Sequence, residues 1–275
     1  MQTQPIDKTK HPTKVLLSFD IEEFDMPIEY GKTISFDEQI SISAEGTKII
    51  LEILKAHKIN ATFFSTVVFA SNAPDLIHRI ISEGHELASH GYFHSQFKNE
   101  HLLLSKIELE KISGKPVNGF RMARMMPVDD KAIQDAGYFY NSSMNPVYLP
   151  GRYNNFFQPR TVFVTDKVMQ IPTSATPIIR FPLFWLSFHN LPQWLYRAAC
   201  VRTIKNDHYL NIYFHPWEFI DLTPPKFGLP KFVSKNSGSK MIDRFNGWIT
   251  WMKSREYHFN TISEFAQVHH QKLFK

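Results

Sequence analysis

The sequence contains one cysteine, Cys200, and this scarcity excludes a scaffold held together by disulfides. It also lacks any run of the roughly 20 apolar residues that a membrane-spanning helix needs. The stretch closest to one, residues 178–200, is interrupted by arginine, proline, histidine and asparagine, so it could touch a membrane surface but not span the bilayer. Runs of five or six basic residues are absent and the net charge of +5 is mild, which argues against a nucleic-acid partner.

The first 14 residues are polar and carry no apolar leader segment. We therefore expect a cytoplasmic protein in which residues 1–13 form a flexible tail. The composition, 43% hydrophobic and 21% charged over 275 residues, is that of a globular chain long enough to bury a full core. This length allows one large domain or two small ones, and nothing in the sequence predicts an oligomeric state.

Short apolar segments typical of strands alternate with helical patterns along the whole chain, which predicts an α/β fold with parallel strands and about seven strand–helix units. Polar residues repeatedly follow the strands. In a closed α/β barrel the carboxyl ends of the strands share one rim, where active sites are built. The clearest predicted strands are residues 15–19, 61–67, 86–89, 117–120, 168–171 and 209–214.

Two histidines, His90 and His94, follow one predicted strand at a spacing that lets both reach one metal ion from a helical turn. Asp20, Glu22 and Glu23 follow another predicted strand. Two histidines and one carboxylate form a three-ligand metal site that leaves positions open for water. The two-residue period of a strand puts Asp20 and Glu22 on one side, so one could bind metal while the other accepts a proton from metal-bound water. Surface histidines and a solvated acidic loop are the alternative interpretation.

The order of the motifs resembles that of the polysaccharide deacetylases, the NodB-homology group also called carbohydrate esterase family 4. The closest subgroup is the one associated with exopolysaccharide loci, whose members share a stretch like residues 257–261. The matching segments are residues 18–24, 84–94, 119–121, 169–174 and 213–218.

This resemblance implies a distorted (β/α)7-type barrel that forms a single domain over residues 1–275. It also implies a metal-dependent hydrolase that removes an N-acetyl group from an amino sugar in a glycan or glycan precursor. One divalent transition metal ion is expected, with zinc as the first choice and cobalt, nickel, iron or manganese as alternatives. By position, the resemblance assigns Asp20 as base, His90 and His94 as metal ligands, Arg121 as the residue that orients the base, and His215 as general acid.

The chain departs from the family pattern at three positions. The family commonly has a second aspartate directly after the base, where this chain has Ile21, so the resemblance points to Glu22 as third ligand and to Glu23 as the fallback. Ala123 stands where the family has the proline of an Arg-x-Pro motif, and Asn141 stands in place of an aspartate. These departures bear on rate and substrate choice more than on reaction class.

Two further residues are candidates for substrate binding. Trp217 offers either a surface on which a sugar could stack or a packing residue, and backbone N–H groups near Arg124 could stabilise an oxyanion. A cytoplasmic location would favour a lipid-linked or nucleotide-linked glycan over a finished wall polymer. Two other functions stay open: hydrolysis of a non-sugar C–N bond, and carbohydrate binding without turnover. The presence of Asp20, His90, His94 and His215 together argues against a binding module, which needs neither a base nor an acid.

Overall fold

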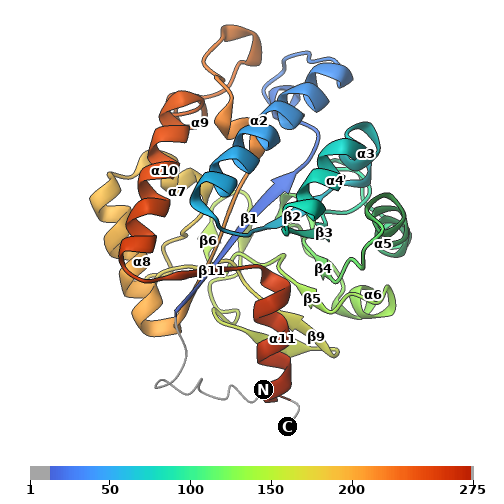
Figure 1. Ribbon diagram of the computed structural model, residues 1–275, viewed down its shortest axis with the longest axis vertical. Coiled ribbons are helices and arrows are strands. Elements are labelled where there is room, and N and C mark those ends of the chain that lie inside the picture. The colour runs from blue at the N-terminus through green and yellow to red at the C-terminus, as the bar shows by residue number, and fades with distance from the viewer. Residues whose placement is uncertain (1–12, 274–275) are drawn as a thin grey trace.

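The computed structural model describes residues 13–273 and shows one curled sheet surrounded by helices (Figure 1). The predicted tail, residues 1–13, lies outside the described residues except for Thr13. Seven parallel strands follow one another in the order β10–β1–β2–β3–β4–β5–β9. Their bounds are β1 Lys14–Ile21, β2 Thr62–Ser65, β3 Glu86–Ser89, β4 Gly119–Phe120, β5 Tyr140–Asn141, β9 Val168–Gln170 and β10 Tyr209–Phe214.

Four other strands lie within the described residues. β8 (Phe163–Thr165) pairs antiparallel with β9 at the edge of the sheet, and β11 (His258–Asn260) pairs in parallel with the start of β1. β6 (Tyr148–Leu149) and β7 (Tyr153–Asn154) form a separate hairpin.

Helices connect and cover the strands, and ordinary capping signals set their ends. Ser35 begins α2 by accepting a hydrogen bond from the backbone of Glu38 at 3.2 Å, while Pro74 begins α4 and Gly84 follows its end with φ of +84°. The larger helices are α2 Phe36–His57, α3 Val67–Asn72, α4 Pro74–Ser82, α5 Glu100–Ser113, α6 Asp130–Asp135, α7 Trp185–Asn190, α8 Gln193–Asp207, α10 Ser239–Ser254 and α11 Ile262–Leu273. The short ones are α1 Met26–Glu29, α9 Lys231–Ser234 and the 3₁₀ turns Ala123–Met125, Pro216–Phe219 and Pro225–Phe227.

The barrel closes through side chains where the strand ladder stops, between β9 and β10. Asn211 on β10 donates to the carbonyls of Ile171 and Pro172, each at 3.1 Å, and its own carbonyl accepts from the backbone of Ser174 at 2.7 Å. Hydrogen bonds of Asn211 therefore join β10 to the segment after β9, where the two strands do not pair. The distorted (β/α) barrel expected from the resemblance is confirmed.

Successive side chains of β1 point alternately into the barrel and towards the helices that surround it. Leu16 packs in a cluster with Phe64 and Tyr140 inside the sheet, whereas Leu17 and Phe19 pack against the helices. The same two-residue period carries Asp20 to the inner face at the carboxyl end of the strand. Among residues 13–273, no helix combines the length and the apolar character needed to cross a bilayer.

His85 lies directly before β3, and its burial is expected to make the stability of the folded chain depend on pH. Its side chain is almost fully buried, Nδ1 accepts from the backbone of Ala61 at 3.3 Å, and burial lowers its pKa from 6.5 to about 4. The unfolded chain therefore binds a proton between these values that the folded chain does not, so stability falls as the pH drops from 6.5 towards 4. We expect denaturant unfolding at pH 5 to show a loss of up to about 2 kcal/mol relative to pH 7.5.

The matched variant is His85→Asn, which keeps an acceptor for Ala61 but does not titrate. It should lose much of that pH dependence. An equal pH dependence in the variant and the parent would contradict the assignment to His85.

Candidate active site

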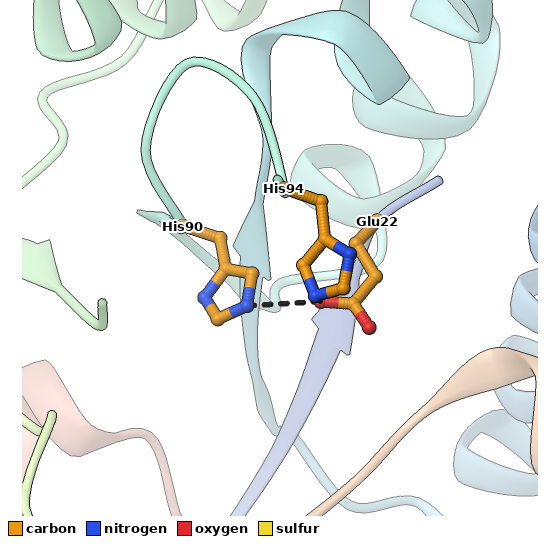
Figure 2. Close-up of side chains that lie close together, drawn as sticks. All are labelled: Glu22, His90 and His94. Atoms are coloured by element: carbon orange, nitrogen blue, oxygen red, sulfur yellow. Dashed lines mark hydrogen bonds and ion pairs between the residues drawn. The ribbon is translucent and has the colours of Figure 1, made fainter. Parts of the chain in front are cut away.

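Three side chains from two strand ends converge at the carboxyl rim of the barrel (Figure 2). Glu22 follows β1, and His90 and His94 belong to the loop after β3. Oε2 of Glu22 lies 3.0 Å from Nε2 of His90 and 3.1 Å from Nε2 of His94, and all three residues are buried. Two imidazole nitrogens and one carboxylate oxygen that face one another in a buried space are a donor set that divalent transition metals bind.

The loop from His90 to His94 forms a series of bends, not the helical turn that the spacing suggested. The backbone N–H of His90 donates to the carbonyl of Ser65 at 2.8 Å, which extends the β2–β3 ladder by one bond. Gly91 then turns the chain with φ of +91°, a conformation that favours glycine. The ladder therefore places the first imidazole, and the turn brings the second one back beside it.

Asp25 orients His94 and was not singled out by the sequence analysis. Its Oδ1 lies 2.9 Å from Nδ1 of His94, and its Oδ2 accepts from Nη2 of Arg124 at 3.0 Å. A carboxylate on Nδ1 fixes the tautomer that leaves Nε2 free to bind metal. Arg124 also pairs with Glu29, so its side chain supports Asp25 at the pocket wall. The acidic run from residue 20 to 25 was the available signal, but it does not tell which carboxylate contacts which histidine.

Burial and mutual charge set the protonation of this cluster. Burial favours a raised pKa for Glu22, but the charge of His94 and the hydrogen bond with His90 outweigh it and hold the pKa at about 2. Burial favours a lowered pKa for His94, but Glu22 and Asp25 outweigh it and raise the pKa to about 9. Without metal, the cluster is thus an ionised carboxylate held by a cationic imidazole.

Glu23 points away from the two imidazole Nε2 atoms. Its carboxylate accepts from the hydroxyl of Thr66 at 2.6 Å, and burial raises its pKa. Glu22 therefore faces the histidines, whereas the side chain of Glu23, the fallback, contacts Thr66 at the start of α3. The role of Glu22 as third ligand stays a prediction.

A buried arginine, Arg121, forms an ion pair with Asp20 inside the barrel. Nη1 of Arg121 donates to Oδ1 of Asp20 at 2.6 Å and to Ser18 at 2.9 Å, and the rest of the guanidinium donates to the hydroxyl and carbonyl of Ser142. The guanidinium also lies over the ring of Phe64, 4.0 Å from its centroid. Arg121 is fully buried, so its position is fixed from every side and Asp20 has a permanent charged partner.

His215 follows β10 and lines the same pocket as Asp20 and Glu22. Its Nδ1 lies 3.0 Å from Oε1 of Glu218, which also accepts from the backbone N–H of His215 at 2.6 Å. The other oxygen of Glu218 lies 2.8 Å from Nε2 of His189. Burial favours a lowered pKa for His215, but the hydrogen bond with Glu218 and the charge of Glu22 raise it above its ordinary value.

The sequence analysis did not identify Glu218 or His189 as parts of the site. Glu218 ends the segment that matches the family motif, which was a usable signal. His189 lies 29 residues from its partner and carries no local signal.

Trp217 stacks against His215 and borders the pocket with very little exposed surface. The two rings are stacked with centroids 4.6 Å apart, and Trp217 is 1% exposed. This burial favours the packing alternative over the sugar-stacking one. The pocket holds about 400 Å³, and other aromatic and apolar side chains complete its wall: Met26, Tyr153, Phe184, Trp185, Tyr213 and Phe232.

The fold and the site define a (β/α)-barrel protein with a buried histidine–carboxylate cluster at the carboxyl ends of its strands. A sequence model described as polysaccharide deacetylase matches residues 8–137. This segment is just under half of the chain, and the match shows that it is similar to the polysaccharide deacetylases.

Characterised relatives match parts of the chain. A chitooligosaccharide deacetylase of Bradyrhizobium sp. (strain ANU 289) is 42% identical over 48 residues, or 18% of this chain and 22% of that protein. The peptidoglycan-N-acetylmuramic acid deacetylase PdaA of Bacillus subtilis (strain 168) is 29% identical over 122 residues, 42% of this chain and 46% of that protein. The aligned segments thus span less than half the length of these relatives.

A solved structure extends the similarity of fold to the whole chain. A Mycobacterium smegmatis protein described as a polysaccharide deacetylase superposes with a TM-score of 0.68 at 17% identity, over 99% of this chain and 96% of that one. At this identity the comparison shows a shared fold.

Proposed function

We propose that this protein is a metal-dependent hydrolase that removes an N-acetyl group from an amino sugar in a glycan or glycan precursor. The observation that carries the proposal is the placement of a candidate metal cluster, a carboxylate–arginine pair and a histidine–glutamate pair around one pocket. The match of residues 8–137 to the polysaccharide deacetylase model supports the same reaction class.

The cluster fits one divalent transition metal ion, with zinc as first choice because its donors are two imidazole nitrogens and one carboxylate oxygen. Glu22, His90 and His94 would hold the ion, and Asp25 would keep His94 in the ligating tautomer. When bound, the metal lowers the pKa of water and polarises an amide carbonyl.

Asp20 and His215 supply the proton transfers that amide hydrolysis needs. Asp20 accepts the proton of the attacking water, and Arg121 holds the carboxylate in place. An amine leaves poorly unless it is protonated, and His215 donates that proton. Glu218 holds Nδ1 of His215, which leaves Nε2 as the donating atom.

The backbone around Arg124 offers the oxyanion contact. Arg124 and Met125 both have positive φ, of 58° and 52°, in the turn that replaces the Arg-x-Pro motif. Arg124 and Met125 line the pocket, so this turn borders it without a proline at position 123. Arg124 remains a candidate substrate-binding residue through this backbone.

The substrate that suits this pocket is an N-acetylhexosamine unit. Aromatic rings such as Tyr153 and Trp185 line the wall and match the apolar faces of a sugar. Both characterised relatives are described as acting on N-acetylated sugars of chitooligosaccharide or peptidoglycan. A lipid-linked or nucleotide-linked glycan and a cytoplasmic location stay predictions.

The test measures acetate released from N-acetylhexosamine oligomers by the purified protein, before and after chelation and after zinc is returned. Ammonia and formate released from small ureides and formamides are measured beside it. Acetate release that chelation abolishes and zinc restores supports the proposal. Ammonia or formate release without acetate release would assign the site to a non-sugar C–N bond, and no turnover of any of these would overturn the proposal.

Glu22→Gln and Glu23→Gln form a matched pair that separates the ligand from its neighbour. Glu22→Gln should weaken zinc affinity by at least about tenfold, because even residues outside the ligand set typically contribute 10–100-fold. Glu23→Gln should change it far less, because Glu23 is bonded to Thr66. Competition with a zinc-binding dye measures both affinities. A larger loss in Glu23→Gln would reverse the assignment.

A further inference from the structure

An exposed turn carries two isoleucines at its tip and lines a groove together with residues of α8. Ala175 pairs with Pro182, and inside that pair Thr176 donates to the carbonyl of Phe181 at 2.9 Å. Ile178 is 80% exposed and Ile179 is 72% exposed. Ile178 has φ of +71°, a region that β-branched residues avoid, so the turn holds an apolar side chain in water at a backbone cost.

Helix α8 continues this apolar surface. Trp194 is 72% exposed and Leu195 is 39% exposed on its first turn. Ile178, Ile179 and Leu195 line one groove of about 490 Å³, and Trp194 lines the hollow beside it. The two hollows share Ala198 and Arg202, so the exposed apolar residues form one continuous face.

Basic side chains border this face. Arg197, Lys205 and Arg255 line the second hollow with Arg202, and no acidic residue lines either hollow. The guanidinium groups of Arg197 and Arg255 lie over the ring of Trp251, 5.2 and 5.6 Å from its centroid. Surfaces that lie in a membrane interface typically combine exposed apolar and aromatic residues with a border of arginine and lysine, as this face does.

We propose that this apolar–basic face, formed by Ile178, Ile179, Trp194, Leu195 and the four basic residues named above, docks on the surface of an anionic lipid bilayer. The isoleucines and Trp194 enter the boundary between headgroups and acyl chains, and the arginines and lysine contact lipid phosphates. Charge complementarity favours this occupant over a second copy of the chain, which would bring the same positive charges against it.

The docking face and the catalytic pocket are joined by one short segment. Phe181 lines the apolar groove, and Phe184, Trp185 and Leu186 line the catalytic pocket. Docking would therefore hold the pocket wall close to the bilayer. The proposal concerns where the chain binds and does not depend on which bond it cleaves.

The test is sedimentation of the full chain with vesicles of phosphatidylcholine alone and of phosphatidylcholine mixed with phosphatidylglycerol. Binding is expected on the mixed vesicles and should weaken as salt is added. Arg202→Ser with Lys205→Ser should lower vesicle affinity by roughly 25-fold, because each basic residue near an anionic surface contributes roughly fivefold. Ile178→Ser with Ile179→Ser should also lower it, and Trp194 fluorescence should be quenched by brominated lipid.

Matched controls come from other sides of the barrel. Leu104→Ser with Ile107→Ser removes two aliphatic side chains, 47% and 48% exposed, from α5, which lies on the other side of the barrel from α8 in Figure 1. Lys48→Ser with Lys55→Ser removes two charges from α2. Both controls should keep parental vesicle affinity, and all variants should keep the parental circular dichroism spectrum. Equal losses in controls and test variants would overturn the proposal, as would no binding to mixed vesicles. A dimer that Ile178→Ser with Ile179→Ser dissociates, without vesicle binding, would assign the face to self-association instead.

Discussion

Replacing Asp20 with asparagine is expected to lower turnover of an N-acetylated oligosaccharide by about 10²–10⁴-fold while zinc affinity is kept. Asparagine matches the shape of Asp20 but cannot accept the proton of the attacking water. The hydrogen bond from Arg121 can remain, because the amide oxygen still accepts it. Acetate release under single-turnover conditions, with zinc content measured on the same sample, checks both parts of the expectation.

Measuring zinc content and turnover of Glu22→Gln beside Asp20→Asn distinguishes the base from the metal ligand. If Asp20→Asn loses zinc while Glu22→Gln keeps it, the two carboxylates exchange roles. Arg121→Ala should act in the same direction as Asp20→Asn, but it leaves a buried carboxylate without its partner, which typically costs about 3–5 kcal/mol of stability. Thermal unfolding of each variant must therefore accompany the kinetics.

Replacing His215 with alanine is expected to slow amide hydrolysis far more than hydrolysis of an activated ester. The amine of the amide needs a proton to leave, whereas an activated alkoxide departs without one. We expect a loss of about 10²–10⁴-fold on the amide and a small change on the ester. Hydrolysis of an N-acetyl sugar and of an aryl acetate by the same preparations measures the contrast.

The pH profile tests the same assignment. A general acid must be protonated, so activity on the amide should fall as the pH rises through the pKa of His215, which lies above its ordinary value. This alkaline limb should vanish in His215→Ala. Glu218→Gln should move it to lower pH, because Glu218 is the hydrogen-bond partner that raises this pKa. Equal losses on amide and ester would mean that His215 shapes the pocket, and an unchanged amide rate would remove it from the mechanism.

Six of the seven strands of the parallel ladder were predicted from the sequence, because each depends on a local pattern, whereas β6, β7 and β8 were not. Apolar runs marked β1, β2 and β10, and Pro74 and Gly84 marked the ends of α4. Closure of the barrel was not predictable in this way. It rests on Asn211, whose partners Ile171 and Pro172 lie about 40 residues away and belong to a segment without a strand ladder to β10.

In the candidate site, too, some residues were predictable from the local sequence and others only from the folded structure. The four-residue spacing selected His90 and His94, and the family resemblance added Asp20 as base, Arg121 and His215. Both kinds of signal are local properties of the chain. The packing of distant segments decided the rest. Thr66, 43 residues away, holds Glu23 and leaves Glu22 to face the histidines, while Asp25 meets His94 across 69 residues.

The sequence by itself determined which segments form most of the strands of the barrel and which residue types follow those strands at its rim. Tertiary structure decided which carboxylate faces which histidine, that Glu218 lies between His215 and His189, and that Trp217 is buried. The physical reason is the same in each case. The sequence specifies the type of each side chain, but its hydrogen-bond partner is whichever group the folded barrel brings within about 3 Å.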